Sequence, residues 1–434
     1  MGSNTGNTDE RLELIHDQIR DNLAGNVIPF WADHTWDDVH GGFFTRLDRY
    51  GNRIDAGEKI LIMQVRMIGA LAWAHHAGLR DRGYLELADR GFEFLVEHFR
   101  DHDEGGFFFS VDRAGAPLMC RKNTDAHAYA MIGLCAYHQA SGNPAAREFA
   151  EHIFDILDSR ARDGEYGYVE DFDGRQWEVL NAEQMHLSGV GIKTIDMHTN
   201  VMEGFSYLAE ITGDIRHRRA LSWVMDLNMT RGLDPAGGAT ITAFDERWVP
   251  VTDAYGRMTT SYGINVELAW LVLRSLRVLG DSTDRHRGKV LGLLDHALEF
   301  GFDHERGGLA AFGPMTGEVE SASELPADRL LRAWWVQAEL LNALADAFDL
   351  TGDERYLEVF IRQWEWIWGY QIDHEHGDWY QDIDPATLKP ITTDKGAEWK
   401  TAFHVTRALI RSARFLDRIL DRRPGRDMCA GFSP

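Results

Sequence analysis

The chain has 434 residues, of which 44% are hydrophobic and 11% aromatic, so it is long and apolar enough to bury a large core. Its formal net charge of -24 disfavours nucleic acid and anionic membranes as partners, because binding to phosphate groups requires a basic surface. This negative charge is more compatible with a neutral or cationic small molecule as the ligand.

The first ten residues are polar and contain no apolar signal-peptide segment. We therefore expect a flexible N-terminus over residues 1–10 and a cytoplasmic protein. No apolar run along the chain is long enough for a membrane helix. A single catalytic domain is expected over 11–422, followed by a flexible tail over 423–434.

A short phrase containing glycine recurs six times along the chain. Each copy consists of a turn-forming segment that is usually acidic, then glycine, and then often aromatic residues. An example is Asp103-Glu104-Gly105-Gly106-Phe107. Successive marker glycines lie 64, 61, 71, 70 and 69 residues apart, which indicates six copies of one structural unit. The marker glycines are Gly42, Gly106, Gly167, Gly238, Gly308 and Gly377.

The segments between the markers have the periodicity of helices. Apolar residues recur at spacings of three and four from Tyr84 to Phe99, and segment 356–368 repeats the pattern. A glycine followed by a capping residue, as in Ser141-Gly142-Asn143, marks the end of one helix and the start of the next. Each unit is therefore expected to contain one helix, a glycine-rich hairpin and a second helix.

Six helical pairs can bury their inner faces only by stacking on one another. We therefore predict an all-α fold, an (α/α)6 barrel with glycine-rich, β-hairpin-like connections. The alternative is an open solenoid of helical pairs. Closure is favoured because the chain stops after six units and because polar residues at the starts of the second helices require a wet cavity. The polar segments 171–191 and 243–260 are expected to form lids over it.

The second helix of each unit begins with a cluster of polar or aromatic residues. If these helices run parallel around the ring, the clusters gather at one mouth of the barrel, where helix N-termini favour hydroxyl-rich or anionic ligands. The clusters contain Lys59 and Arg66; Lys122, Asp125 and His127; Asp196, His198 and Asn200; Tyr262, Asn265 and Glu267; Arg332, Trp334 and Trp335; and Glu398, Trp399 and His404.

These clusters suit a sugar, because aromatic rings pack on its apolar faces and polar side chains bind its hydroxyl groups. The alternative for each tryptophan is ordinary packing between helices. His404 titrates near neutral pH and is the best candidate for a general acid or base, although a structural histidine is as common. Asp196 and Glu267, on neighbouring inner helices, are candidates for a carboxylate pair that hydrolyses glycosides.

Nothing in the sequence calls for a cofactor or a metal ion. Residues 374–376 and Asp378 lie in one of the hairpin markers, so we interpret them as solvated turn residues rather than metal ligands. Motifs of nucleotide-binding proteins and serine hydrolases are absent in the required setting. No CxxC spacing predicts a disulfide framework or structural zinc among Cys120, Cys135 and Cys429.

At these clusters the sequence resembles the N-acylglucosamine 2-epimerase superfamily, which includes cellobiose 2-epimerase and aldose–ketose isomerases. The resemblance spans nearly the whole chain. The best-matching stretches are 59–66, 193–203, 262–267, 332–339 and 398–404.

The resemblance implies that the C2 proton of an open-chain sugar is removed to give an enediol-like intermediate and is then returned. In the family two histidines on opposite sides of the substrate transfer the protons, a glutamate supports one of them, and an arginine lies near the sugar oxygens. His404 matches one histidine, Glu267 the glutamate and Arg66 the arginine. Trp335 and Trp399 fall where the family has sugar-facing tryptophans.

The second histidine of the family is missing, because Ile264 occupies its place. Asn200 falls where the disaccharide epimerases have a further histidine, and His127 falls where the family often has glutamine. In the leading interpretation the chain is an epimerase or isomerase for a mono- or disaccharide, and His198, His127 or Asp196 replaces the lost base. The alternatives are a glycoside hydrolase and a sugar-binding protein without turnover.

From these arguments we predict a monomer or homodimer with two sets of site residues. The predicted catalytic residues are His404, Glu267, Asp196 and His198. The predicted substrate-binding residues are Arg66, His127, Asn200, Tyr262, Trp335 and Trp399.

Overall fold

The computed structural model describes residues 5–421 except 56, 175, 181–190, 236–237, 253–258 and 316–329. The predicted C-terminal tail and parts of both predicted lids lie outside the described residues. Helix α1 runs over Thr5–Asp21. Residues 5–10 of the expected flexible N-terminus form the first turns of this helix.

Within the described residues, six helices form a closed inner ring. Each inner helix packs against the next one along the chain, and the last packs against the first. The predicted barrel is confirmed, because an open solenoid would leave the first and last helices apart. The inner helices are α3 (Leu61–His76), α5 (Thr124–Ser141), α7 (Ile195–Thr212), α9 (Tyr262–Leu279), α11 (Trp334–Thr351) and α13 (Phe403–Asp421).

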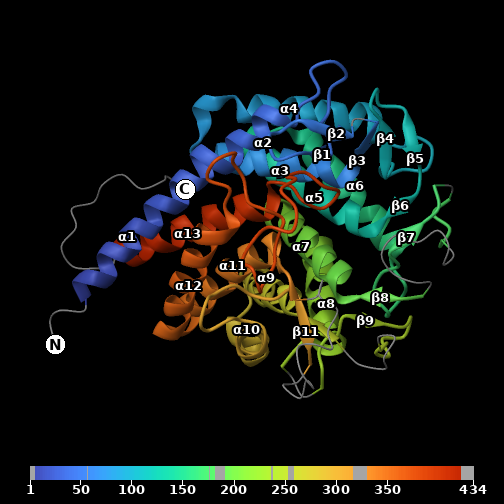
Figure 1. The fold of residues 1–434 in the computed structure, drawn as a ribbon. Coiled ribbons are helices and arrows are strands. Elements are labelled where there is room, and N and C mark those ends of the chain that lie inside the picture. The colour runs from blue at the N-terminus through green and yellow to red at the C-terminus, as the bar shows by residue number, and fades with distance from the viewer. Residues whose placement is uncertain are drawn as a thin grey trace.

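An outer layer of helices covers this ring. Each outer helix packs mainly on one inner helix, and α1 covers α13, so the two ends of the described chain lie together. Figure 1 shows α1 and α13 side by side. The other outer helices are α4 (Tyr84–Phe94) on α3, α6 (Pro144–Ile156) on α5, α8 (Ile215–Arg231) on α7, α10 (Arg287–Phe300) on α9 and α12 (Glu354–Trp366) on α11.

Short helical segments extend or join these helices. Several outer helices continue directly into one π-helical turn, which alters the direction in which the chain enters the following hairpin. The segments are η1 (Asn22–Val27), α2 (Ile28–His34), η2 (Arg80–Arg82), η3 (Leu95–Phe99), η4 (Leu157–Ala161), η5 (Thr283–Arg285) and η8 (Ile367–Gln371).

The two layers differ in their residues because they are packed differently. Inner helices contact neighbours on all sides and are buried almost throughout, whereas an outer helix buries only one stripe. Close packing of α3 and α5 depends on Gly133, where an added β-carbon would lie 2.3 Å from the Val65 carbonyl oxygen. The predicted helix ends are confirmed, since Gly142 closes α5 in the left-handed conformation and Asn143 caps α6.

The six predicted hairpins are present, and each is closed by an antiparallel bridge just after its marker glycines. The bridges join Trp36 to Phe43, Arg100 to Phe107, Arg162 to Tyr168, Leu233 to Thr240, Phe302 to Leu309 and Ile372 to Trp379. The hairpins therefore repeat one structure around the barrel.

Short antiparallel strands connect neighbouring units where the inner helices begin. The strand before an inner helix pairs with the strand that follows the next hairpin, and a bridge between Leu47 and Gly396 joins the first unit to the last. Figure 1 shows most of these strands along one side of the molecule. The linking pairs are β3 (Glu58–Ile60) with β4 (Ser110–Asp112), β6 (Lys122–Asn123) with β7 (Asp171–Phe172), β8 (Lys193–Thr194) with β9 (Ala243–Phe244), β10 (Thr259–Ser261) with β11 (Phe312–Pro314) and β12 (Arg332–Ala333) with β13 (Asp382–Ile383). In addition, β5 (Pro117–Met119) extends the β3–β4 sheet, and β1 (Arg46–Leu47) pairs with β2 (Arg53–Asp55).

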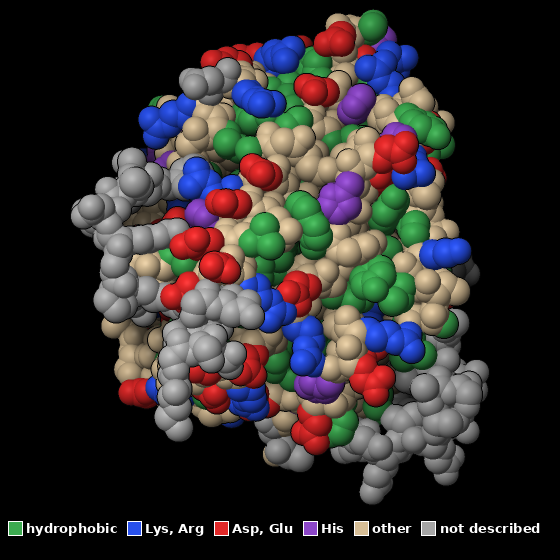
Figure 2. All heavy atoms as spheres, turned by 60° about the vertical axis from the view of Figure 1, so that its left-hand side comes forward, with side chains coloured by type: hydrophobic (Ala, Val, Ile, Leu, Met, Phe, Trp, Pro, Cys, Tyr) green, Lys and Arg blue, Asp and Glu red, His purple; other side chains and the backbone are tan. Residues whose placement is uncertain are grey.

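The surface carries charges of both signs. On the face drawn in Figure 2, Lys and Arg side chains are interspersed with Asp and Glu side chains. None of the helices in the described part of the chain is long and apolar enough to span a membrane.

Candidate active site

A cavity of about 220 Å³ opens at the end of the ring where the inner helices begin. All six inner helices contribute to its wall, and the loop before α13 adds a tryptophan. Side chains far apart in the sequence therefore meet around one space. The lining residues are Arg66, Asp125, Tyr129, Asp196, Asn200, Glu267, Trp334, Trp335, Trp399 and His404.

Helices α5 and α7 each contribute residues to the wall from two levels, one helical turn apart. Asp125, Asp196 and His404 are the second residues of their helices, and Tyr129 and Asn200 lie four residues after the first two. Residues at this spacing lie one above the other on the same helix face, so both levels point into the ring.

The fourth residue of each inner helix points the other way, because two residues along a helix amount to about 200° of rotation. His198 is such a residue. Its Nε2 accepts a hydrogen bond from the Tyr168 backbone N–H at 3.0 Å, and its Nδ1 donates to the Thr194 carbonyl oxygen at 2.8 Å. Both ring nitrogens are thus used, and the prediction of His198 as a catalytic residue is wrong.

His127 repeats this arrangement one unit earlier. Its Nε2 accepts from the Phe107 backbone N–H at 3.0 Å, and its Nδ1 donates to the Asn123 carbonyl oxygen at 2.7 Å. Burial lowers the pKa of His127 to about 3, so the ring is neutral and holds the hairpin in place. The prediction of His127 as a substrate-binding residue is therefore also wrong.

The same position serves the same purpose in other units. Gln64 accepts a hydrogen bond from the backbone N–H of Phe43 at 2.7 Å, and Gln337 accepts one from Leu309 at 2.9 Å. Asn265 accepts from the backbone of the fourth hairpin at 2.8 Å. Histidine, glutamine and asparagine are interchangeable here as acceptors for one hairpin N–H, which is a structural role.

Tyr262 does not line the cavity either. It is 1% exposed, and its hydroxyl donates to the Pro314 carbonyl oxygen at 3.3 Å. Its ring fills the space left by Gly301 and Gly313, where an added β-carbon would collide with it. The predicted contact between Tyr262 and a sugar is wrong. The nearby Ile264 belongs to a small apolar cluster and offers no group for proton transfer.

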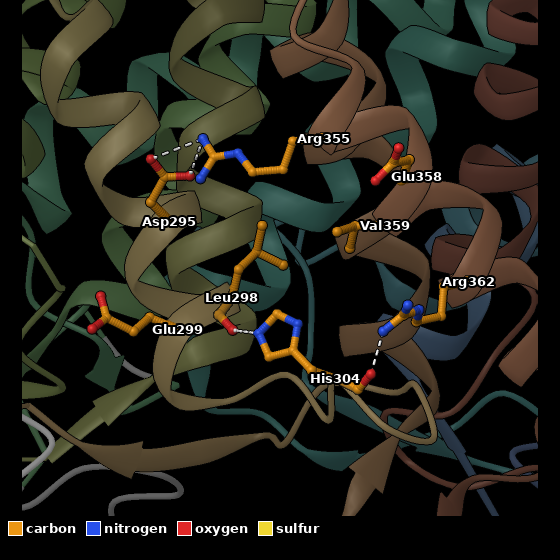
Figure 3. A pocket seen from close by; sticks show the side chains of 8 residues that line it. All are labelled: Asp295, Leu298, Glu299, His304, Arg355, Glu358, Val359 and Arg362. Atoms are coloured by element: carbon orange, nitrogen blue, oxygen red, sulfur yellow. Dashed lines mark hydrogen bonds and ion pairs between the residues drawn. The ribbon is translucent and has the colours of Figure 1, made fainter. Parts of the chain in front are cut away.

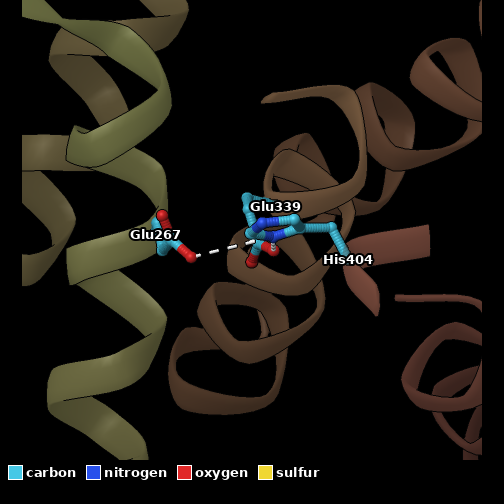
Figure 4. Close-up of side chains that lie close together, drawn as sticks. All are labelled: Glu267, Glu339 and His404. Carbon is cyan, nitrogen blue, oxygen red and sulfur yellow. Dashed lines mark hydrogen bonds and ion pairs between the residues drawn. The ribbon is translucent and has the colours of Figure 1, made fainter. Parts of the chain in front are cut away.

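His404 is held by a carboxylate. Its Nδ1 lies 2.7 Å from Glu339 Oε1 and 3.9 Å from Glu267 Oε1 (Figure 4). The other Glu339 oxygen accepts hydrogen bonds from Trp270 Nε1 at 2.7 Å and from Asn342 Nδ2 at 3.1 Å. Glu339 is thus fixed in place and orients the imidazole.

The protonation states follow from burial and from neighbouring charges. Burial lowers the pKa of His404 to about 4, against the opposing hydrogen bond to Glu339. Burial alone would raise the pKa of Glu339, but the charge of Arg407 and the hydrogen bond from His404 outweigh it and lower that pKa. Burial and the charge of Glu339 raise the pKa of Glu267 well above its ordinary value. At neutral pH, His404 is therefore neutral beside the ionised Glu339, and Glu267 holds its proton more tightly than an ordinary glutamate.

This protonation pattern fixes the tautomer of His404. Its Nδ1–H donates to the Glu339 carboxylate, so Nε2 carries the lone pair. Among the described residues, Nε2 has no hydrogen-bond partner. The ring can therefore accept a proton from a molecule in the cavity.

The positive charge of Arg407 compensates the negative charge of the acidic side chains next to His404. Its guanidinium pairs with Glu203, lies 2.7 Å from Glu339 Oε1 and lies 3.4 Å from Glu267 Oε1. Potential metal-ligand atoms of Glu267, Glu339 and His404 lie within 4.8 Å of one another. A metal ion there would compete with the guanidinium for the same carboxylate oxygens, so these residues fit a metal poorly.

Arg66 and Trp399 form another part of the wall. Arg66 Nη1 donates to the Trp399 carbonyl oxygen at 2.6 Å, and the guanidinium stacks on the Tyr129 ring at 3.8 Å from its centroid. Arg66 is only 3% exposed, yet its Nε–H has no partner among the described residues. A buried, unused donor with a positive charge suits an oxygen that becomes negative during a reaction.

Two aspartates lie elsewhere on the wall and are joined by an amide. Asn200 Nδ2 donates to Asp125 Oδ1 at 2.8 Å and to Asp196 Oδ1 at 3.2 Å. Tyr129 donates its hydroxyl to Asn200 Oδ1 at 3.1 Å. Burial and the facing Asp196 raise the pKa of Asp125 to about 7. The Asp196 side chain is open to the cavity, but the surrounding protein withdraws it from bulk water and raises its pKa as well.

Several residues of the site were not predicted to have a role in it. Asp125, Trp334 and Glu339 were noted only as parts of sequence clusters or matched stretches, and Tyr129 and Arg407 were missed. Helical spacing contains the signal, because Tyr129 lies four residues after Asp125, and Glu339 lies four after Trp335. A further correction concerns Asp378, which was interpreted as solvated but is buried in an ion pair with Lys400.

A larger groove of about 580 Å³ lies on the outer surface between α10 and α12. Figure 3 shows that its polar side chains face one another: Arg355 pairs with Asp295 at 3.1 Å, and His304 Nε2 lies 2.8 Å from the Leu298 carbonyl oxygen. It contains none of the predicted site residues, so the smaller cavity in the ring is the candidate active site.

Comparison with known proteins identifies related sequences and structures. A sequence model of the N-acylglucosamine 2-epimerase (GlcNAc 2-epimerase) family matches residues 42–408. Cellobiose 2-epimerase from Bacteroides fragilis is 27% identical over 407 residues, which cover 92% of this chain and 98% of that protein. N-acylglucosamine 2-epimerase from Bos taurus is 26% identical over 421 residues, covering 95% and 94%. The solved structure of cellobiose 2-epimerase from Bacillus thermoamylovorans is similar with a TM-score of 0.83 at 25% identity, covering 94% of this chain and 100% of that chain.

Proposed function

Because the chain belongs to the N-acylglucosamine 2-epimerase family, we propose that it is a sugar 2-epimerase or aldose–ketose isomerase. It acts on an open-chain mono- or disaccharide through an enediol-like intermediate. The observation that carries this proposal is the neutral imidazole of His404, which Glu339 orients within a cavity that also contains Arg66.

In the proposed mechanism, Nε2 of His404 removes the C2 proton of the sugar. The electrons of the C2–H bond form the C1=C2 double bond, and the carbonyl oxygen becomes negative. Arg66, which lines the cavity, stabilises this oxygen through its positive charge. Return of a proton to C2 gives the epimer, and return to C1 gives the ketose.

The remaining site residues have supporting roles in this proposal. Trp335 and Trp399 provide apolar surfaces for the sugar, and Asn200 is a polar wall residue. Glu267, whose raised pKa favours the protonated carboxyl group, donates a hydrogen bond to a sugar oxygen. Asp196 is a second group for proton transfer. A cytoplasmic location and a monomeric or homodimeric state remain predictions from the sequence.

Proton NMR of sugars incubated with the protein in D2O tests the proposed function. Mannose, glucose, fructose, N-acetylglucosamine and cellobiose form a suitable panel. We expect deuterium at C2 and the appearance of a new sugar without bond cleavage. Hydrolysis of a disaccharide without exchange would instead favour a glycoside hydrolase that uses Asp196 and Glu267, which has less support from the relatives. Binding with neither reaction would indicate a sugar-binding protein.

A further inference from the structure

Epimerisation at C2 requires two acid–base groups on opposite faces of the sugar. The first group removes the proton from one face, and the second returns a proton to the other face. His404 is available for one face, but His127 and His198 have both ring nitrogens bound to backbone groups. Among the residues that the structure describes, the second group must therefore be another residue of the cavity wall.

Few candidates remain among the wall residues. Glu339 and Glu267 lie 2.7 Å and 3.9 Å from His404 Nδ1, so they lie beside the first group rather than opposite to it. Helices α13, α3, α5, α7, α9 and α11 follow one another around the ring, so α7 lies opposite α13. Asp196 is the second residue of α7, as His404 is of α13, and both line the cavity at the same level.

We propose that Asp196 transfers the proton on the face of the sugar opposite to His404. In this proposal Asp125 is a positioning residue that Asn200 holds beside Asp196, so that the two carboxyl groups carry one proton between them. The inference rests on the proposed function and names the second proton-transfer group of that site. Asp196 suits this role because its side chain is open to the cavity, whereas Asp125 is 4% exposed.

The bridge formed by Asn200 explains why the aspartates act together. The Tyr129 hydroxyl occupies the amide oxygen, so the amide nitrogen faces both carboxyl groups. Once one of two adjacent carboxyl groups is ionised, the other ionises less readily, because like charges repel. The pair therefore holds one proton near neutral pH, in line with the raised pKa of Asp125.

The proton transfers balance in both directions. His404 gains the C2 proton of one epimer while the C2–H electrons form the C1=C2 bond. The Asp196–Asp125 pair then gives its proton to the opposite face of C2, the C1 carbonyl re-forms, and the pair becomes doubly ionised. In the reverse direction the doubly ionised pair removes the proton and the imidazolium of His404 returns one.

Deuterium exchange measured separately for the two C2 epimers tests this inference. With the Asp196→Asn variant in D2O, we expect exchange at C2 of one epimer and no conversion into the other. With His404→Asn we expect exchange of the other epimer only. Asp295→Asn removes an exposed carboxylate on α10 and serves as the control with wild-type behaviour.

Exchange limited to one epimer also shows that each variant is folded and binds sugar. The inference is overturned if Asp196→Asn interconverts the epimers at the wild-type rate, or if both variants exchange the same epimer. It is also overturned if a folded Asp196→Asn protein, checked by its thermal melt, exchanges neither. A wild-type protein that exchanges neither epimer of any sugar would instead refute the proposed function.

A second variant tests the role of Asp125. Without the facing carboxyl, Asp196 ionises more easily, so Asp125→Asn should epimerise slowly at neutral pH and recover as the pH is lowered. The other charged groups that face the pair are Arg66 from α3, Asp171 from β7 and Glu267 from α9. They are unchanged in the variant. An unshifted pH profile of epimerisation in Asp125→Asn would contradict the shared proton.

Discussion

The Glu339→Gln variant gives the sharpest test of how His404 is prepared for proton transfer. Donors surround both carboxylate oxygens: Oε1 accepts from His404 and Arg407, each at 2.7 Å, and Oε2 accepts from Trp270 and Asn342. A glutamine has one acceptor oxygen, so its amide nitrogen must face one of these pairs of donors. If the nitrogen faces His404, the imidazole must accept at Nδ1, and Nε2 then carries a hydrogen and cannot act as a base.

The expected losses of activity and stability in Glu339→Gln follow from the contacts that the substitution removes. Loss of the base costs on the order of 10²–10⁴-fold in the rate of C2 exchange. Leaving part of the charge of Arg407 without a partner lowers the free energy of unfolding by roughly 3 kcal/mol. The assays are deuterium exchange at C2 by NMR and urea denaturation. A Glu339→Gln protein that exchanges at the wild-type rate would refute the role of Glu339.

Glu267→Gln is the matched control for this experiment. The pKa of Glu267 is raised well above its ordinary value whereas that of Glu339 is lowered, so the negative charge resides preferentially on Glu339. We expect a smaller loss of stability than in Glu339→Gln. An equal loss in both variants would contradict the assignment of the negative charge to Glu339.

Three further predictions concern pH, the hairpin contacts and helix packing. Because the pKa of His404 is lowered from 6.5 to about 4, its contribution to stability is present above pH 6.5 and is lost as the pH falls toward 4. For the epimer that His404 deprotonates, kcat/KM for C2 exchange should fall on the acid side near pH 4, and a fall centred near 6.5 would contradict a buried, neutral base. His127→Gln should retain activity within a few-fold, because Gln337 makes the same contact in another unit, whereas a complete loss of exchange would restore His127 as a site residue. Gly133→Ala should lower the free energy of unfolding by about 1–3 kcal/mol, measured in urea, because the new methyl group collides with the Val65 carbonyl oxygen; an unchanged value would show that α3 and α5 are not so closely packed.

The architecture was predictable because the repeat is visible in the chain. Six marker glycines at similar spacing set the number of units, and apolar periodicity set the helices between them. The closure of the ring and the gathering of Arg66, Glu267 and His404 around one cavity followed from that count. These long-range predictions are confirmed.

The errors in the predicted site arose within single helix turns. Asp196 and His198 were grouped because they are close in sequence, yet two residues along a helix point to opposite sides. His198 binds a hairpin, and Asn200 rather than His198 shares the cavity face with Asp196. Helical geometry alone would have separated these residues.

Other features of the site could not be obtained from the sequence. The hydrogen bond between Glu339 and His404 joins α11 to α13, and the Asn200 bridge joins α5 to α7. Such contacts depend on the distances between helices, and the periodicity of a sequence does not give these distances. The protonation of Glu267 likewise depends on burial and on the charge of Glu339, both of which exist only in the folded ring.

The central claim is that His404 exchanges the C2 proton of a sugar bound inside the ring. Its most direct test compares C2 deuterium incorporation by the wild-type protein and by His404→Asn, starting from whichever epimer His404 is proposed to deprotonate. We predict steady incorporation with the wild type and none above background with the variant. Equal incorporation by the two folded proteins would contradict the claim.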